Sequence, residues 1–273
     1  MLQTDRRDQL IGWCRQAFRF VIPVECIGCD RMLGNDPIPF FCRHCWDRIV
    51  PMAGPSCSRC DQPFVSSAAT SWTPGHQCQA CLERPPAYER AWTLFPYLPP
   101  LQDAICSLKY RGKVALAKPL AALMIDALPR ECDADLILPV PLHPARLRAR
   151  EFNQSLLLAD RLGRHLSRPV SATRLIRVLA TDPQTTLTRQ ERLRNLRQAF
   201  EVRNPEAIAG RRILLVDDVF TTGATINECA KTVLKAGAMS VSALTLARTI
   251  DTSLVPDHLF AERAARSRSI LEI

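Results

Sequence analysis

The sequence lacks any apolar run long enough to cross a bilayer. Its most apolar early stretch, residues 17–24, is broken by Arg19 and Pro23 and falls far short of the roughly 20 residues that a membrane-spanning helix needs. A signal peptide is not recognisable either, because the charged residues 5–8 precede only a short amphipathic segment without a small-residue cleavage site. We therefore expect a cytoplasmic protein without membrane insertion, with residues 1–23 forming an amphipathic helix.

Aromatic residues are also scarce, at 6% of the chain, and none alternates with the basic residues of its most positive segment. That segment, residues 146–212, has fifteen arginines, no lysine and six acidic residues, an excess equal to the chain's net charge of +9. Without interleaved aromatic rings, it offers no stacking platform for single-stranded nucleic acid. Arginine forks bind phosphate oxygens in pairs, so the segment suits a loop closing over a phosphorylated ligand, a track along a nucleic-acid backbone, or a solvated basic surface.

Cysteine is plentiful: eight of the twelve cysteines form four Cys-x-x-Cys pairs. Two intervening residues let both thiolates reach one zinc ion at about 2.3 Å, and two pairs complete a tetrahedral structural site. A disulfide framework is disfavoured in a reducing cytosol, and a redox motif would need one pair at a strand-to-helix turn. The sequence predicts two structural zinc ions held by neighbouring pairs, although the spacing also permits an interleaved arrangement. The expected ligands are Cys26, Cys29, Cys42 and Cys45 for one ion and Cys57, Cys60, Cys78 and Cys81 for the other.

Other residues near these pairs receive less weight as ligands. His44 and His76 stand beside cysteine pairs, and we interpret both as solvated neighbours rather than zinc ligands. The four remaining cysteines stand singly in apolar contexts and are predicted to be small core residues, not nucleophiles. They are Cys14, Cys106, Cys132 and Cys229.

The most specific motif lies in residues 213–225. An apolar run, residues 213–216, is typical of a buried parallel strand and ends in Asp217 and Asp218. Small or hydroxylated residues then lead into a helical pattern at residues 226–236. Backbone N–H groups at a helix N-terminus bind phosphate, and paired carboxylates accept hydrogen bonds from a diol, so the motif suits a ribose 5-phosphate. The alternative is an ordinary strand, turn and capped helix. The small residues are Thr221, Thr222, Gly223, Ala224 and Thr225.

Residues 216–225 resemble the 5-phosphoribosyl 1-pyrophosphate (PRPP) signature of type I phosphoribosyltransferases. With the four cysteine pairs, residues 24–249 as a whole resemble the ComF family, which is associated with bacterial competence and DNA uptake. The resemblance implies an α/β protein of the type I phosphoribosyltransferase fold, a parallel sheet with helices on both faces, with a small N-terminal zinc-ribbon domain. The expected parts are a double zinc ribbon at 24–84, a phosphoribosyltransferase domain at 88–249 and a C-terminal extension at 250–273.

Regular alternation of helical and strand patterns supports that architecture. Strands are expected at residues 91–97, 136–140, 213–216 and 241–247, and helices at 101–109, 114–128, 152–166 and 226–236. The proline-rich residues 139–146 are expected to form a stiff loop that continues neither sheet nor helix. Ligands of such sheets bind beyond the carboxyl ends of the strands, where this loop and the loop of residues 217–225 both lie.

The resemblance also implies roles for individual residues. Asp217 and Asp218 would accept hydrogen bonds from the ribose 2- and 3-hydroxyls as catalytic residues, while the loop 221–225 would hold the 5-phosphate. The loop after the second strand corresponds to the pyrophosphate-binding loop. A Mg²⁺ ion bound with PRPP would stabilise the departing pyrophosphate. Pro141, Leu142 and Arg146 are the expected contacts of the pyrophosphate-binding loop, and Arg189 is the expected catalytic arginine of residues 181–199, which resemble the family's flexible catalytic loop.

One position departs from the family pattern. ComF-like chains carry Arg-Gly-Phe-Asn-Gln, and this chain has Glu151 in place of the glycine. If the position needs a positive φ or a close approach to an anion, glutamate fits it badly. If the position instead begins a helix, glutamate stabilises the helix dipole.

The expected function is that of a ComF-like protein which binds PRPP and Mg²⁺ and takes part in competence or DNA uptake, with or without phosphoribosyl transfer. Two alternatives use the same residues: a non-catalytic zinc-ribbon factor that binds single-stranded DNA, and a PRPP sensor. A competence helicase is a further partner that the resemblance implies. No segment for recognising an acceptor base is evident, so the sequence identifies no acceptor.

Overall fold

The computed structural model describes residues 24–64, 75–178 and 199–250. Several predictions therefore lie outside the described residues: the amphipathic helix at 1–23, Cys14, Arg189 with its loop, and the C-terminal extension. Among the described helices, none has the length and apolarity to span a bilayer.

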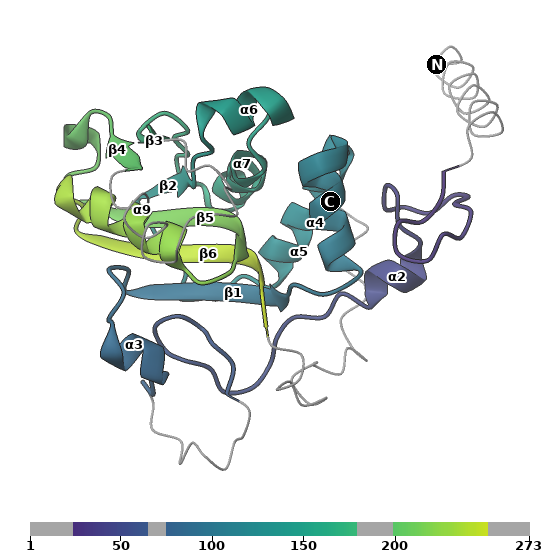
Figure 1. Ribbon diagram of the computed structural model, residues 1–273, viewed down its shortest axis with the longest axis horizontal. Helices are drawn as coiled ribbons and strands as arrows, with labels where there is room; N and C mark the ends of the chain where they lie inside the picture. Colours follow the sequence, from purple (N-terminus) through teal and green to yellow (C-terminus); the bar gives the residue numbers. More distant parts are fainter. Residues whose placement is uncertain (1–23, 65–74, 179–198, 251–273) are drawn as a thin grey trace, which may run out of the picture.

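A four-stranded parallel sheet in the order β1-β6-β5-β2 forms the centre of the fold (Figure 1). Its strands read as apolar runs because both faces of the sheet are covered. In β5, Leu214 and Val216 face one core and Ile213 and Leu215 face the other. The predicted parallel sheet is thus confirmed. Its strands are β1 (Arg90–Pro96), β2 (Leu136–Pro139), β5 (Arg212–Phe220) and β6 (Ser240–Arg248).

Helices cover both faces of this sheet, as expected for the fold class. One core contains apolar residues of α4 (Leu101–Arg111), α5 (Ala117–Asp126) and α7 (Gln154–Leu166), and η1 (Val114–Leu116) leads into α5. The opposite core contains the apolar side of α9 (Ala224–Lys235).

Four short elements lie outside the four-stranded sheet. The antiparallel pair β3 (Leu175–Arg177) and β4 (Phe200–Val202) was not predicted, and η2 (Pro205–Ala207) follows it. Helix α6 (Pro144–Arg150) begins inside the stretch predicted to be a stiff loop, so that prediction was wrong for residues 144–146. Pro144 occupies the first turn of α6, where a backbone N–H has no helical partner to lose, and His143 caps the helix.

Strand β5 is longer than the sequence suggested. Its pairing with β6 continues through Asp217 and Phe220, which lie opposite Thr245 and Arg248. The two aspartates therefore belong to the strand and not to the loop after it. Backbone hydrogen bonding to β6 outweighs the weak strand preference of aspartate.

The cysteine-rich segment packs against both faces of the sheet. Its first half, with α2 (Arg43–Asp47), joins the core of α4, and its second half, with α3 (Gln79–Glu83), joins the core of α9 (Figure 1). Between them the chain follows the outer edge of β1. There Met52 N–H donates to the Leu94 carbonyl at 2.9 Å, and Ala91 N–H donates to the Arg59 carbonyl at 2.8 Å.

Candidate functional site

The carboxyl ends of β2 and β5 lie side by side and place the two predicted loops at one edge of the sheet. Pro139 is paired with Val216 in the β2–β5 register, and Val140 N–H donates to the Val216 carbonyl at 2.9 Å. Asn153, which caps α7, donates from Nδ2 to the Val140 carbonyl at 3.1 Å. The β2 loop, the start of α7 and the aspartates of β5 thus form one connected site.

Asp217 is partly buried beside the start of α7. Its Oδ1 accepts hydrogen bonds from Ser155 Oγ at 2.8 Å and from Asp218 N–H at 2.9 Å. Burial, with the neighbouring charge of Asp218, raises the pKa of Asp217 to about 7. Asp217 therefore gives up its proton less readily than an exposed aspartate does.

Asp218 has a different environment. Its side chain is only 5% exposed, and Oδ2 lies 2.5 Å from Nζ of Lys109 in α4. Sequence reasoning missed Lys109, although one signal was available. The residue follows Ile105 by four positions and so shares the apolar stripe of α4, where a charged residue needs a partner.

Gly223 forms the N-cap of α9 with a φ of 73°, a conformation that favours glycine. A Cβ at this position would collide with the ring of Phe220. The five predicted loop residues lie around this helix start: exposed Thr221 and Thr222 precede the N-cap, and Ala224 and Thr225 begin the helix. The N-terminal end of a 12-residue helix is thus presented beside the aspartates.

The loop after β2 is partly withdrawn from solvent. Pro141 is buried and Leu142 is half-buried, whereas Arg146 is exposed on α6. His143 turns its Nδ1 back to accept the Ala145 N–H at 3.2 Å. The structure thus brings Pro141 and Leu142 to the carboxyl edge and places Arg146 on the following helix.

Glu151 ends α6 with a φ of 66°. The sequence left two alternatives for this position, a positive φ or the start of a helix. The structure has the positive φ. A helix start at Glu151 is wrong because the next helix, α7, is capped by Asn153. A left-handed conformation costs a non-glycine residue about 1–2 kcal/mol. Arg150 beside it donates to Gln154 Oε1 at 3.2 Å and stacks on the Tyr110 ring at 4.9 Å.

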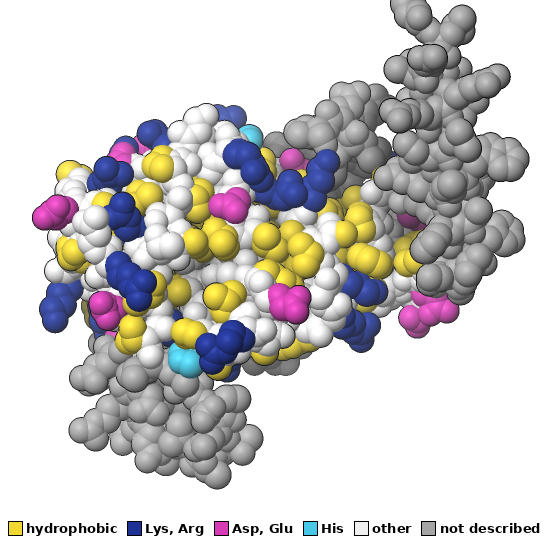
Figure 2. Space-filling model, turned by 90° about the horizontal axis from the view of Figure 1, so that it is seen from above, with side chains coloured by type: hydrophobic (Ala, Val, Ile, Leu, Met, Phe, Trp, Pro, Cys, Tyr) yellow, Lys and Arg dark blue, Asp and Glu magenta, His cyan; other side chains and the backbone are white. Residues whose placement is uncertain are grey.

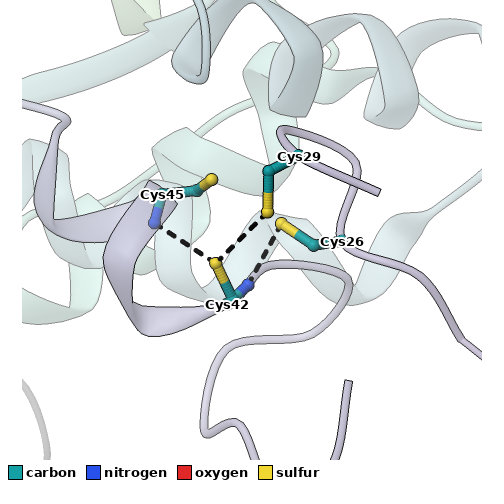
Figure 3. Close-up of side chains that lie close together, drawn as sticks. All are labelled: Cys26, Cys29, Cys42 and Cys45. Carbon is teal, nitrogen blue, oxygen red and sulfur yellow. Dashed lines mark hydrogen bonds between the residues drawn. The ribbon is translucent and has the colours of Figure 1, made fainter. Parts of the chain in front are cut away.

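The eight paired cysteines form two separate clusters of four, each with all sulfur atoms within 4.8 Å of one another. Figure 3 shows the four side chains of the first cluster converging from its two Cys-x-x-Cys pairs, each of which is called a knuckle. The structure confirms that neighbouring pairs share a cluster and that the interleaved pairing does not occur. The first cluster contains Cys26, Cys29, Cys42 and Cys45, and the second contains Cys57, Cys60, Cys78 and Cys81.

Both clusters fit zinc. Zinc–sulfur bonds of about 2.3 Å imply sulfur atoms about 3.8 Å apart in a tetrahedron. Cys29 and Cys42 have sulfur atoms 3.7 Å apart, as do Cys60 and Cys78. The Cys57 sulfur accepts a hydrogen bond from the Cys78 N–H at 3.2 Å. Hydrogen bonds, of which the one from the Cys60 thiol has the largest effect, lower the pKa of Cys57 to about 4, although burial alone would raise it.

Among the three single cysteines that the structure describes, Cys132 and Cys229 are buried, as predicted. Cys106 is only half-buried, so its assignment to the core was wrong, and its sulfur lies 3.3 Å from Tyr97 Oη. Neither His44 nor His76 belongs to a cluster.

Comparison with known proteins gives two domain matches. A model of the phosphoribosyl transferase domain matches residues 153–263, and a model of the double zinc ribbon domain matches residues 17–83. The chain is similar to the DNA utilization protein YhgH of Escherichia coli (strain K12), with 36% identity over 222 residues, which is 76% of this chain and 97% of that protein.

Two competence proteins are also similar. Competence protein F of Haemophilus influenzae is 30% identical over 231 residues, covering 82% of this chain and 90% of that protein. Competence protein ComFC of Bacillus subtilis is 27% identical over 243 residues, covering 82% of this chain and 95% of that protein.

Proposed function

The chain belongs to the ComF family, and on this basis we propose that the carboxyl edge of its sheet binds PRPP with Mg²⁺ in a protein that serves DNA uptake or use. One observation supports the ligand most directly. Along a single strand-loop-helix unit, a partly buried carboxylate, Asp217, is followed by a helix N-terminus capped by Gly223. The first group suits a sugar hydroxyl and the second suits a phosphate.

The 5-phosphate would bind at the start of α9. A helix N-terminus carries unpaired N–H groups and a partial positive charge. Thr221 and Thr222 are exposed just before the N-cap residue Gly223, so an anion can approach the helix start and receive hydroxyl hydrogen bonds. The Ala224 N–H donates a long hydrogen bond of 3.4 Å to Thr222 Oγ1. A phosphate oxygen can take the place of Thr222 Oγ1 as the acceptor of this N–H.

Asp217 would be the principal acceptor for the ribose hydroxyls. Asp218 is buried and engaged by Lys109, so it is less available for a ligand than its neighbour. The Lys109 ammonium also offsets part of the negative charge that Asp218 places next to Asp217. Lys109 is accordingly proposed as a functional residue that keeps the aspartate pair compatible with an anionic ligand.

Magnesium would enter with the ligand. In the part of the chain that the structure describes, the only groups of three or more metal-ligating side chains are the two cysteine clusters. Mg²⁺ commonly keeps several waters and binds substrate phosphates together with one or two carboxylates, so it does not need an all-protein cage. When bound, it would neutralise pyrophosphate charge, while Asp217 is the carboxylate that this chain offers to the sugar.

The two cysteine clusters would serve the fold and not the chemistry. Four thiolates fill all four positions of a tetrahedral zinc site and leave none for water or substrate. Each cluster also contributes buried cysteines to one of the two cores of the sheet.

Single-stranded DNA is a second candidate ligand, favoured by exposed arginines on α6. Seen from above, basic side chains are spread over the face of the molecule shown in Figure 2. Arg146 and Arg148 of α6 and Arg164 of α7 are exposed. Such arginines can bind phosphates of a nucleic-acid backbone with strong salt dependence.

Calorimetric titration of the parent protein with PRPP and Mg²⁺ tests the proposal. We expect saturable binding that Asp217→Asn weakens, while Arg212→Lys, at the opposite end of β5, leaves it intact. A parent protein that does not bind PRPP but binds single-stranded DNA would replace the first candidate with the second. A screen for pyrophosphate release with candidate acceptors then separates an enzyme from a PRPP sensor.

A further inference from the structure

Arg248 connects the second cysteine cluster to the sheet. It is the last residue of β6 and is only 5% exposed. Its Nη1 donates to the backbone carbonyl of the zinc-ligating residue Cys60 at 2.7 Å, and its Nη2 donates to Gln62 Oε1 at 2.6 Å. A buried guanidinium with these two acceptors depends on the position of the Cys57–Cys60 knuckle.

The same guanidinium contacts the last residue of β5. It stacks over the Phe220 ring with 4.7 Å between Cζ and the ring centroid, and the two residues are direct neighbours in the β5–β6 register. The Phe220 ring in turn fills the space in which a Cβ of residue 223 would lie. Contacts therefore run without a gap from Cys60 through Arg248 and Phe220 to Gly223.

A second link runs beside the first. Asn227, in the first turn of α9, accepts the Ala87 N–H at 2.8 Å on Oδ1. Ala87 precedes Tyr88, whose ring meets the Phe220 ring edge-on at 6.5 Å. Cys57, Cys60 and Cys81 share one buried core with Tyr88, Phe220 and Ile226.

The first cluster is arranged differently. Its segment packs against both ends of α4: Gly28 approaches Pro100, the N-cap of the helix, and the ammonium of Lys113, just past the helix end, lies 4.2 Å from the Phe40 ring centroid. Its buried cysteines belong to the opposite core of the sheet. The second cluster thus shares a buried core with the start of α9, whereas the first cluster shares a buried core with α4.

We propose that Arg248 and Phe220 are positioning residues through which zinc at the second cluster and a phosphate at Gly223 bind cooperatively. This inference rests on the proposed PRPP site. When the metal leaves, the Cys57–Cys60 knuckle is no longer held, and the Cys60 carbonyl loses its fixed position. The buried guanidinium then lacks one of its two well-placed acceptors, which is costly for a charged group, and the guanidinium no longer holds the Phe220 ring against Gly223.

Reciprocity gives the first test. If zinc at the second cluster tightens phosphate binding, then PRPP must tighten zinc binding there by the same factor. The equilibrium transfer of zinc to a chromogenic chelator is measured with and without PRPP and Mg²⁺. We expect PRPP to raise the affinity for one of the two ions about five-fold or more, a typical lower limit for coupled sites, and to leave the affinity for the other unchanged.

Arg248→Lys and Phe220→Leu should remove this gain in zinc affinity. Lysine cannot provide two planar donors and a stacking surface together, and leucine fills the apolar space without offering the ring. Arg212→Lys is the matched control, because Arg212 lies at the other end of β5 and pairs with Asp135 at 2.8 Å. An equal effect of PRPP on zinc affinity in the parent and in Arg248→Lys would overturn the inference.

Hydrogen exchange of the ligand-free protein tests the same link without PRPP. We expect faster exchange in residues 221–226 of Cys60→Ser and Arg248→Lys, and parental exchange there in Cys29→Ser of the first cluster. Unchanged exchange in folded Arg248→Lys would also overturn the inference. A parent that fails to bind PRPP would instead remove the proposed function, while the exchange measurement would still decide whether the zinc knuckle positions the loop.

Discussion

Lys109 of α4 and Asp218 of β5 form an ion pair of 2.5 Å at the carboxyl edge of the sheet, and both side chains are largely buried. The pair joins a helix on one face of the sheet to the strand that carries the candidate site. Because a buried charge is stable only with its partner, the two residues should respond to substitution as a unit.

Lys109→Met is expected to lower the free energy of unfolding by about 3–5 kcal/mol, because it leaves the Asp218 carboxylate buried and unpaired. Adding Asp218→Asn to this variant should restore part of the loss. Denaturant titrations of the parent, the two single variants and the double variant measure the coupling. Additive effects of the two substitutions would show that the pair contributes nothing as a unit.

The raised pKa of Asp217 predicts a pH dependence of stability. A carboxyl with a folded-state pKa of about 7 holds a proton that the unfolded chain releases near pH 4. Its contribution is therefore fully present below about pH 4 and is lost as the pH rises through 7. Between these values the slope is at most about 1.4 kcal/mol per pH unit. We expect Asp217→Asn to lose stability less steeply from pH 5 to 8 than the parent in thermal or denaturant unfolding.

Gly223→Ala should destabilise the protein and weaken PRPP binding. Alanine is strained at a φ of 73°, and its Cβ would also meet the Phe220 ring. Gly210→Ala is a matched control, because Gly210 has a φ of 69° but no atom within 4 Å of an added Cβ. Each substitution should cost about 1 kcal/mol or more through the backbone, and only Gly223→Ala should add the collision and lose ligand affinity. Equal changes in melting temperature would exclude a role for the ring.

Glu151→Gly should stabilise the protein by up to about 1 kcal/mol, because glycine adopts a φ of 66° without steric cost. It should also tighten PRPP binding if the position approaches pyrophosphate. Glu151→Gln separates the two effects, since it removes the charge and keeps the backbone strain. An unfolding midpoint for Glu151→Gly equal to that of Glu151→Gln would rule out strain as the cause.

Metal analysis should find two zinc ions per chain. Cys57→Ser is expected to retain about one and to lose much of the stability of the second cluster, because metal binding energy is folding energy at such sites. Cys132→Ser, at a buried single cysteine outside both clusters, should retain two ions. A well-folded parent without metal would contradict this prediction.

The sequence predicts the sheet and the cysteine clusters well because both follow from local patterns. The apolar run before Asp217 and the spacing of Cys57 and Cys60 each need only a few neighbouring residues to be recognised. Strands β3 and β4 have three residues each, too few to establish a period of two. The two aspartates, Asp217 and Asp218, were expected to follow the strand. They belong to β5 because β5 pairs with β6 beyond Val216, and the local sequence pattern does not specify a partner strand.

The contacts that define the candidate site are long-range and escape such patterns. Arg248 and Cys60 are 188 positions apart, and Ser155 and Asp217 are 62 apart. Nothing in the spacing of either pair indicates that they meet. Lys109 is an intermediate case, since its place on an apolar stripe marks it as unusual but does not identify Asp218 as its partner.

The path of the cysteine-rich segment along β1 gives it a protective role at the border of the sheet. An unpaired outer strand offers free N–H and C=O groups to other chains and promotes aggregation. Here the backbone groups of Met52 and Arg59 form hydrogen bonds with β1, and Thr93 N–H of β1 donates to Asp61 Oδ2 at 2.8 Å. A fragment that begins at residue 88 would lose this cover and the cysteines of both cores. Its sheet would then be open to pairing with a second molecule along β1.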